Sequence, residues 1–449
     1  MLTVNEAIRA LGETVRQIVA EAVSSTRLVP GEYRGYQWKL DDFKYDDSGV
    51  VVPGAQGDYV NLKSWFRAWE VLEPRIKTNP SYKEALDALQ QNYAALPLAD
   101  WLDNFMKAFI SATLPESGKL YKAEQIVGQF LNDLEGGPVS HTAQVFLQGI
   151  VLRSEEIEVE RGVCIRKPRK EDFETPFPAE IAEHFPRYPS AIVEMRTVGA
   201  RERSPQLIQE QVELGVALLR LFNVGSVKWM RYELSCDSIV GPWPHGLLTS
   251  GDKNPARETY VIRAEDEPRL KRFWQTMTPV LPRGIYVPQN GVSHITLAYD
   301  RYSDALLFNG IFERRIANAV MGLEALFLKE KQELSNRLSL RVSKLVSLIS
   351  SRKPLEVRSM LIDAYEIRST FAHGGNLSND RKTKVDRKYG STKALLITLI
   401  DHLRVSILAT IMCGLGKEAL INLVDNALLD PQEQERLTSV MATTAGLIS

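Results

Sequence analysis

Apolar residues recur at helical spacing at both ends of the chain and at strand spacing in its middle. At the N-terminal end the helical pattern covers 5–23 and 82–114, with one break at Pro97. Between these segments, 31–58 is rich in glycine, aspartate and aromatic residues, which is typical of a long loop or of short strands. We therefore expect 1–136 to be a mainly helical region.

The pattern changes near Gly136, and apolar residues then alternate with polar ones from 144 to 166. Alternation over short runs predicts strands. The helix that follows should start at Ser204-Pro205, because serine caps helices well and proline fits the first helical position. We expect a mixed α+β domain over 137–292, with a sensing or regulatory role as a hypothesis. Its remaining elements are strands at 191–197, 227–234 and 259–262, and helices at 204–222 and 267–277.

From about residue 304 only helical periodicity remains. Short connections between such helices are typical of an antiparallel bundle. The chain is therefore expected to be an α+β multidomain protein, with an all-α bundle over 304–449. The predicted helices of the bundle are 305–329, 333–350, 355–373, 391–413, 417–429 and 431–443.

The composition of the 449 residues narrows the class of protein. Hydrophobic residues make up 44 % and charged residues 25 %, as in ordinary soluble proteins. The net charge of −1 gives no general attraction for nucleic acid, so any such attraction must be local. The three cysteines are scattered and odd in number, which argues against a disulfide framework and fits a reducing cytosol.

The sequence indicates a cytoplasmic protein without a membrane span. The most apolar run, 394–413, contains Asp401, His402 and Arg404, each of which is costly at the centre of a bilayer. We expect a buried helix there. The N-terminal segment carries acidic residues early and lacks an uninterrupted apolar core, so we do not expect a signal peptide.

The most informative motif lies in the predicted helix at 355–373. Arg368 follows Leu361 by two helical turns and falls on the same apolar stripe. A guanidinium keeps its proton, so an inward arginine needs a carboxylate or a phosphate to meet it. Glu324, on the edge of the apolar stripe of the 305–329 helix, is the natural partner.

His373 comes five residues after Arg368, where the helix has to stop. Gly374 and Gly375 follow it, and glycine is the usual residue in the left-handed position that ends a helix. An inward arginine beside a helix-end histidine is an arrangement suited to cleaving a phosphodiester.

Several segments together resemble the Apea-like branch of the HEPN superfamily. They are RIANAVMGLEALFL (315–328), RLSLRVSKLVSLI (337–349), AYEIRSTFAHGG (364–375) and the apolar helix after them. That superfamily is defined by an Arg-x4–6-His motif on an all-α bundle, and Arg368 with His373 would supply the four-residue version. Ser369 is the polar residue that usually follows the arginine. The resemblance covers about 305–430.

The resemblance implies a homodimer in which two Arg/His pairs face each other across a cleft. Active members are metal-independent endoribonucleases of bacterial antiviral defence and toxin–antitoxin systems, and they leave 2′,3′-cyclic phosphate and 5′-hydroxyl ends. By this resemblance His373 moves a proton, Arg368 stabilises phosphoryl oxygens, Ser369 hydrogen-bonds the substrate and Glu324 orients Arg368. The implied partners are RNA, a second copy, and a phage-derived or antitoxin protein as trigger; no cofactor and no metal are implied.

Two groups of basic residues are candidates for binding RNA. They are Arg337, Arg341 and Lys344 in the second predicted bundle helix, and Arg381, Lys382 and Lys384 after the motif. The first group is spaced to lie on one helix face, as following a phosphate backbone requires, but a solvated face has the same spacing. The second group would form a loop that guides RNA, or only a solvated loop.

A non-catalytic interpretation also fits these residues. Arg368 would then be a structural residue satisfied by Glu324, and His373 a helix cap favoured by the helix dipole. The domain would act as a dimerisation module or as an RNA- or nucleotide-binding module. The six histidines are not grouped with cysteines or carboxylates at the spacing of metal ligands, so we expect no metal site.

Overall fold

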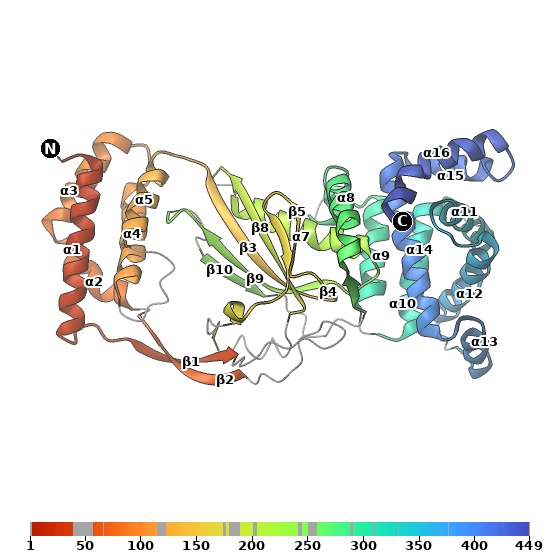
Figure 1. Cartoon of the computed structure of the whole chain (residues 1–449), viewed down its shortest axis with the longest axis horizontal. Helices are drawn as coiled ribbons and strands as arrows, with labels where there is room; N and C mark the ends of the chain where they lie inside the picture. The colour runs from red at the N-terminus through yellow and green to blue at the C-terminus, as the bar shows by residue number, and fades with distance from the viewer. Residues whose placement is uncertain are drawn as a thin grey trace.

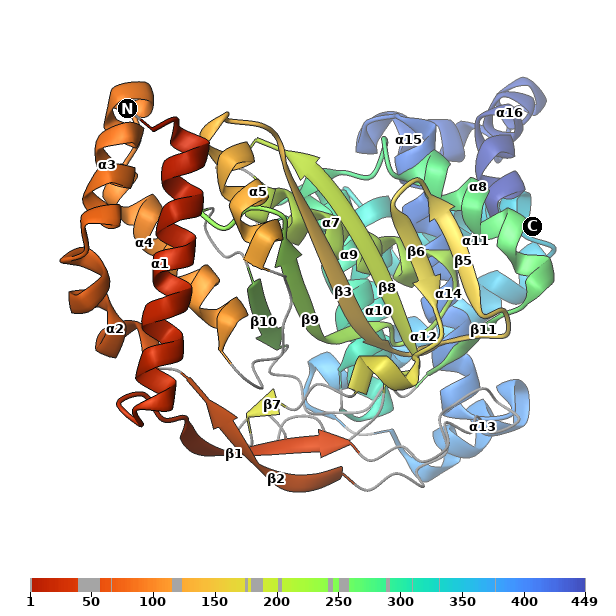
Figure 2. The same cartoon turned by 60° about the vertical axis from the view of Figure 1, so that its left-hand side comes forward.

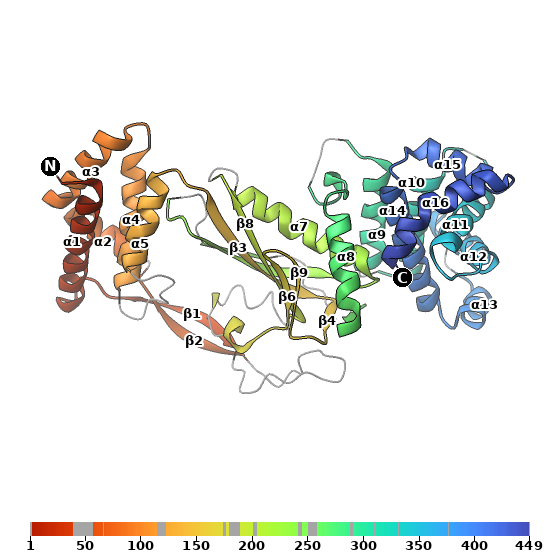
Figure 3. The same cartoon turned by 45° about the horizontal axis from the view of Figure 1, so that its top comes forward.

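The computed structural model describes most of the chain as a mainly helical α+β protein with three parts in a row (Figure 1). A helical unit lies at the N-terminal end, a twisted sheet lies in the middle, and a helical bundle holds the C-terminus (Figures 1 and 3). The described residues are 2–38, 57–65, 67–114, 123–173, 177–178, 189–200, 204–240, 245–249, 258–287, 291–308, 310–330, 332–375 and 377–448.

The N-terminal unit is built from amphipathic helices around a core of its own. The first helix begins with a capping box, in which Thr3 and Glu6 exchange hydrogen bonds. The predicted break at Pro97 is confirmed, because one helix ends at Tyr93 and the next begins at Leu98. The helices are α1 (Val4–Ser24), α2 (Ala68–Lys77), α3 (Pro80–Tyr93), α4 (Leu98–Thr113) and α5 (Ala123–Leu134).

A β-hairpin extends from this unit beneath the central sheet (Figure 2). Strand β1 (Gly31–Trp38) pairs with β2 (Gly57–Ser64) and with the short β7 (Phe177–Pro178), all antiparallel. Strands therefore occupy both ends of the segment for which the sequence left a loop or strands open. Residues 39–56 of that segment lie outside the described residues.

The central sheet has six strands, in the order β10-β9-β3-β8-β6-β5, and every neighbouring pair is antiparallel. One face is covered by α7 (Ser204–Phe222) and α8 (Glu267–Met277), which contact β3, β8 and β5 (Figure 2). The strands are β3 (Val139–Gln148), β5 (Glu156–Glu160), β6 (Val163–Arg166), β8 (Ala191–Gly199), β9 (Lys228–Cys236) and β10 (His245–Thr249). The strands and helices predicted for this domain are thus confirmed to within a few residues.

A second, two-stranded sheet closes the end of the domain nearest the bundle. Its strands, β4 (Ile150–Leu152) and β11 (Tyr260–Ile262), run parallel. Gly149 makes the turn between β3 and β4 with φ of +86°, and a Cβ there would lie 2.4 Å from the carbonyl oxygen of Ser226. Only glycine fits this position, because it tolerates both the left-handed backbone and the close approach.

The bundle differs from its prediction in two places. The predicted helix 305–329 is wrong, since α9 (His294–Leu307) ends and α10 (Phe312–Phe327) begins within it. The Asn-Gly pair at 309–310 is a turn signal in the sequence, but it was overlooked because the apolar residues on both sides follow helical spacing. The basic run 381–388 is not a loop but part of α13 (Asn379–Tyr389), which Ser378 caps. The remaining helices are α11 (Leu334–Ile349), α12 (Pro354–Ala372), α14 (Thr392–Cys413), α15 (Lys417–Asn426) and α16 (Pro431–Ile448).

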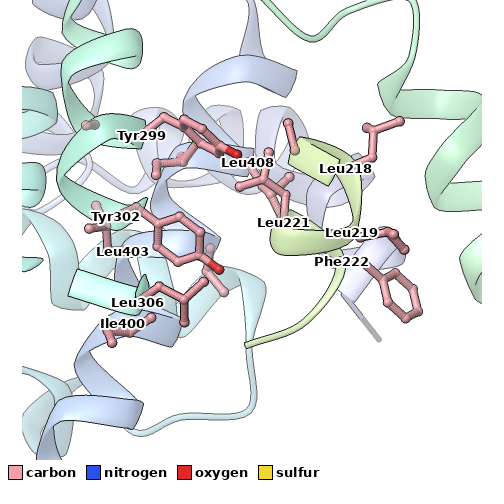
Figure 4. Packing of buried hydrophobic residues seen from close by; sticks show 14 of the residues in the cluster. Leu218, Leu219, Leu221, Phe222, Tyr299, Tyr302, Leu306, Ile400, Leu403 and Leu408 are labelled. Atoms are coloured by element: carbon pink, nitrogen blue, oxygen red, sulfur yellow. The ribbon is translucent and has the colours of Figure 1, made fainter. Parts of the chain in front are cut away.

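Sheet and bundle share one continuous hydrophobic core. Figure 4 shows where they meet: Leu221, at the end of α7, points toward Leu408 of α14, and Tyr302 and Leu306 of α9 belong to the same cluster of buried residues. The α9 helix belongs to this contact and also packs against α10, and it begins at His294, before residue 304 where the bundle was predicted to start. Periodicity alone does not show that this helix packs against both the sheet domain and the bundle.

Helix α14 is long and apolar enough to cross a membrane by length and composition, yet 78 % of its most apolar window is buried inside the protein. That burial is the property of the core helix of a soluble protein. His402 lies in this helix with an exposed fraction of 1 %, as expected for a core histidine. Burial lowers the pKa of His402 to about 4, against the opposing effect of Asp401.

We predict that His402 makes the stability of the protein depend on pH. Its pKa is lowered on folding, so the unfolded chain binds the proton more tightly, and stability falls as pH drops from about 6.5 towards 4. By pH 4 the loss from this residue is on the order of 3 kcal/mol. Urea unfolding between pH 7 and pH 4 measures it.

The variant His402→Leu should flatten this part of the pH profile. A remaining slope is expected from His141 and His294, whose pKa values burial also lowers. An unchanged profile in His402→Leu would show that His402 carries no such linkage.

Candidate active site

Arg368 and Glu324 form an ion pair between the last turns of α12 and α10. The Nη2 of Arg368 donates to Oε2 of Glu324 at 3.1 Å. The pairing that the sequence predicted is therefore present. The side chains keep exposed fractions of 28 % and 17 %, so Arg368 is half-buried rather than inside the core.

The reason for this position is the register of α12. Its buried residues are Val357, Leu361, Ala364 and Ile367, so Ile367 takes the inward place that the sequence analysis gave to Arg368. Arg368 lies one residue further round the helix, at the edge of the apolar face. An edge position lets the stem of the arginine pack against the core while its guanidinium stays within reach of solvent.

Tyr365 is a third member of this cluster. The guanidinium carbon of Arg368 lies 5.7 Å from the centre of the Tyr365 ring. Burial raises the pKa of Glu324, and Arg368 and the Tyr365 hydroxyl partly offset that rise. The sequence analysis missed Tyr365, although its place three residues before Arg368 on one helix was the available signal.

The Arg368–Glu324 pair has unused hydrogen-bonding capacity. Within the described part of the chain, Nε of Arg368 and Oε1 of Glu324 are buried and have no hydrogen-bond partner. A buried polar group without a partner is costly, and such groups in native proteins need an explanation. A ligand or substrate that brings a new partner to either group would recover that cost.

His373 is the C-terminal cap of α12, as predicted. Gly374 has a φ of +75°, and its N–H donates to the carbonyl oxygen of Phe371 at 3.0 Å. Gly375 donates to the carbonyl oxygen of Thr370 at 2.9 Å. The two glycines thus end the helix, and the imidazole of His373 is left exposed with no hydrogen bond to any described residue.

Arg368 and His373 do not point the same way from α12. Residues five apart are separated by roughly 140° around a helix axis. Ser369, between them, is half-buried, and its hydroxyl makes no hydrogen bond to a described residue. A single chain therefore offers a cation, a hydroxyl and an imidazole around the end of one helix, with the imidazole beyond the last turn.

The predicted role of Arg341 in RNA binding is wrong. Its side chain is 2 % exposed and makes bidentate ion pairs with Glu330, at 2.6 and 2.9 Å, and with Asp425, at 2.7 and 2.8 Å. It also donates to the carbonyl oxygen of Phe327, at the end of α10. Two acidic residues from distant segments turn this side chain inward, so it cannot reach a phosphate backbone.

Arg337 and Lys344 remain on the surface, but without Arg341 they do not form a continuous basic stripe. Arg337 is 41 % exposed and lies within 3.5 Å of carboxylate oxygens of both Glu330 and Glu333. Lys344 donates to the side-chain oxygen of Gln434 at 2.8 Å. Exposed contacts of this kind are weak, so both side chains are free to move to another partner.

The basic residues of α13 are largely neutralised by neighbouring helices. Arg381 pairs with Glu366 of α12, and Lys382 lies 3.9 Å from Glu313 of α10. Lys384 is exposed and has no acidic partner among the described residues. Of the three residues predicted to guide RNA here, two therefore hold α13 to the bundle.

The chain matches no protein-family model, no curated protein and no solved structure. Its function therefore has to be argued from the geometry of its own residues. No group of three or more histidine, cysteine or carboxylate side chains suited to a metal occurs among the described residues.

We predict that Arg341 is a structural residue. Replacing it with methionine should lower the free energy of unfolding by about 3–5 kcal/mol, because Glu330 and Asp425 lose their shared cation. The matched variant Arg337→Met, on the exposed side of the same helix, should cost less than about 1 kcal/mol. Chemical denaturation of both variants makes the comparison.

Glu330 provides a second readout of the same interaction. Arg341 lowers the pKa of Glu330 to about 2, so the stabilisation is present above about pH 4.5 and is lost as pH falls towards 2. That acid-dependent loss should be absent from Arg341→Met. Equal stability of the two methionine variants would contradict the structural role.

Proposed function

We propose that this protein is a metal-independent endoribonuclease of HEPN type, with its active site at Arg368 and His373. The observation that carries the proposal is the Arg368–Glu324 pair, in which an acidic residue of α10 holds an edge arginine beside an exposed helix-end histidine. The resemblance of 305–430 to Apea-like HEPN domains supports the same assignment.

The reaction would be a transesterification within the RNA chain. The 2′-oxygen attacks the adjacent phosphorus, its proton passes to a base, and the bond from phosphorus to the 5′-oxygen breaks. A proton is returned to the 5′-oxygen, leaving a 2′,3′-cyclic phosphate and a 5′-hydroxyl. His373 would transfer one of these protons, since histidine suits general acid–base catalysis near neutral pH.

Arg368 would bind the phosphoryl oxygens as negative charge builds on them. Its Nε–H lacks a partner in the described structure, and Glu324 already fixes one edge of the guanidinium. Glu324 is a positioning residue in this scheme, because it acts through Arg368. Ser369 would donate its hydroxyl to the substrate.

A second function, a non-catalytic dimerisation or RNA- or nucleotide-binding module, is favoured by the charges around the site. Arg341 is buried, and Arg381 and Lys382 are paired with acidic residues of the bundle. Few free cations therefore remain to hold a long RNA. In this second reading Arg368 and His373 only stabilise the end of α12.

The proposed setting is the bacterial cytoplasm, in antiviral defence or as a toxin. A nuclease that acts on the host's own RNA has to be restrained, so we propose that the first 292 residues sense a trigger such as a phage-derived or antitoxin protein. Of the basic residues predicted to bind RNA, Arg337, Lys344 and Lys384 are those whose side chains stay available at the surface among the described residues.

We predict that His373→Ala and Arg368→Ala each abolish RNA cleavage while the protein stays folded. His373 is exposed and Arg368 lies at the edge of the core, so neither change should unfold the protein, although Arg368→Ala leaves Glu324 without its ion-pair partner. Arg368→Lys should restore little activity, because an ammonium cannot bind bidentately. EDTA should leave cleavage by the wild type unchanged. The assay follows a labelled RNA and identifies the cyclic phosphate at the new 3′ end.

Arg358→Ala is the matched control, since Arg358 lies on the same helix and, among the described residues, its side chain hydrogen-bonds to Asn336 on α11 and forms no ion pair. It should cleave like the wild type, and the circular dichroism spectra of all four variants should agree. Full activity in His373→Ala would remove the catalytic assignment and favour the binding module.

We also predict a two-fold dimer with the end of α12 near its axis. At the end of α12 the described residues of one chain offer one exposed imidazole, whereas this reaction uses a base at the 2′-oxygen and an acid at the 5′-oxygen. A second copy would supply the second His373 through an isologous contact. Sedimentation at micromolar concentration should show the dimer, and cleavage by a strict monomer would rule out the shared site.

A further inference from the structure

A cavity of about 620 Å³ lies between α7 and the segment that leads into α9, away from the candidate active site. Its size is that of a small-molecule site. The segment forms one wall with Ile285, Tyr286 and Val287, and the two helices supply polar side chains. The cavity is thus apolar on one side and polar on the other, as ligand sites usually are.

The polar lining is acidic and only partly neutralised. Glu210 and Glu213 come from α7 and Asp300 from α9. Glu210 pairs with Arg283 at 2.5 Å. Neither Glu213 nor Asp300 has an ion-pair partner in the described part of the chain.

The nearby cations are committed to other groups. Arg220 lies near enough to Glu213 to lower its pKa, but its Nε–H donates to the carbonyl oxygen of Val227 at 2.7 Å. Arg301, beside Asp300, pairs instead with Asp304 at 3.2 Å. Two carboxylates from different helices therefore line the cavity without an ion pair to a described residue.

Trp229 fixes one of these carboxylates. Its indole N–H donates to Oε1 of Glu213 at 3.1 Å, which holds the side chain in place and leaves its second oxygen for another donor. Tyr286 adds an aromatic ring to the lining, and such a ring attracts a cation. Burial raises the pKa of Glu213, which Arg220 partly offsets, and burial and Asp304 raise that of Asp300, which Arg301 partly offsets.

We propose that this cavity binds a small linear organic polycation, with two or more ammonium or guanidinium groups joined by short apolar chains. Glu213 and Asp300 would each meet one positive group, and the wall at Ile285 and Val287 would pack against the chain. Neutral ligands would leave both carboxylates uncompensated, and anions would be repelled. The proposal stands on the cavity alone and does not depend on the ribonuclease activity.

The position of the cavity gives binding a measurable effect on the whole protein. It is lined by α7 and α9, and Tyr302 of α9 donates to the carbonyl oxygen of Arg220 on α7 at 2.6 Å. A ligand that bridges these helices strengthens the contact between sheet and bundle. Since it binds only the folded state, it raises the melting temperature with increasing concentration.

The test uses the full chain, with spermidine as the probe and hexane-1,6-diol as a neutral control of similar length. Titration calorimetry and thermal unfolding are measured at fixed ionic strength for the wild type, Glu213→Gln and Asp300→Asn. Glu435→Gln, an exposed site on α16, changes the net charge equally and serves as the matched control. Glutamine at 213 keeps an acceptor for Trp229, so the fold is preserved.

The expected result is one saturable spermidine site per chain in the wild type and in Glu435→Gln, with no binding of the diol. Each pocket variant should lose about tenfold in affinity, since removing one charged partner costs about that much. Unchanged affinity in both pocket variants would place any binding elsewhere and overturn the proposal. Equal binding of the diol, or no saturable binding of spermidine, would overturn it as well.

Discussion

Arg404 of α14 donates to the carbonyl oxygens of Leu221 and Phe222, at the end of α7, at 2.9 and 3.0 Å. These oxygens belong to the last turn of a helix, where carbonyl groups lack partners within the helix and carry its partial negative charge. Asp401 holds the other side of the guanidinium at 2.7 and 2.9 Å. Tyr302 caps the preceding carbonyl, so side chains of the bundle satisfy the end of α7. Separating bundle from sheet would leave these three carbonyl groups without their donors and would leave Arg404 with Asp401 as its remaining partner, and an unpaired buried carbonyl is costly.

The same arrangement recurs within the bundle. Arg315 donates to the carbonyl oxygens of Ala305 and Leu306 at the end of α9, and Arg341 to that of Phe327 at the end of α10. Three buried arginines thus each meet the negative end of a helix, where burying a guanidinium costs least. This placement explains why a basic stripe read from spacing was wrong at Arg341. The spacing of basic residues shows which face of the helix they occupy. It does not show that Arg341 pairs with Asp425, which lies 84 positions away in the sequence.

Hydrophobic periodicity was sufficient to predict most strands and helices of the sheet domain, because the side of each element that faces the core is visible in its own short stretch of sequence. Periodicity was insufficient where contacts with distant segments determine which way a side chain points or whether a segment is helical. At Arg368 the difference between inward and edge positions is one residue, and Ile367 takes the inward one because it is apolar. In α13 the ion pairs to Glu366 and Glu313 hold together a segment whose charges alone indicate a loop. The Arg368–Glu324 pair was predictable, since an arginine placed toward an apolar stripe needs a carboxylate and Glu324 marks the edge of the neighbouring stripe.

These contacts set a physical limit on how the proposed site can bind RNA. Salt-dependent binding to a nucleic-acid backbone scales with the number of free cations, and near α12 most cations are already paired with carboxylates. In α13 only Lys384 and Arg387 lack an acidic partner among the described residues. Among the described residues near α12, few cations therefore remain free for a long RNA, so the proposed binding would rely on contacts at the cleavage point or on a second copy. A two-fold dimer would also double the number of free cations at the proposed site. The proposed catalysis and the proposed RNA binding would therefore both require a dimer.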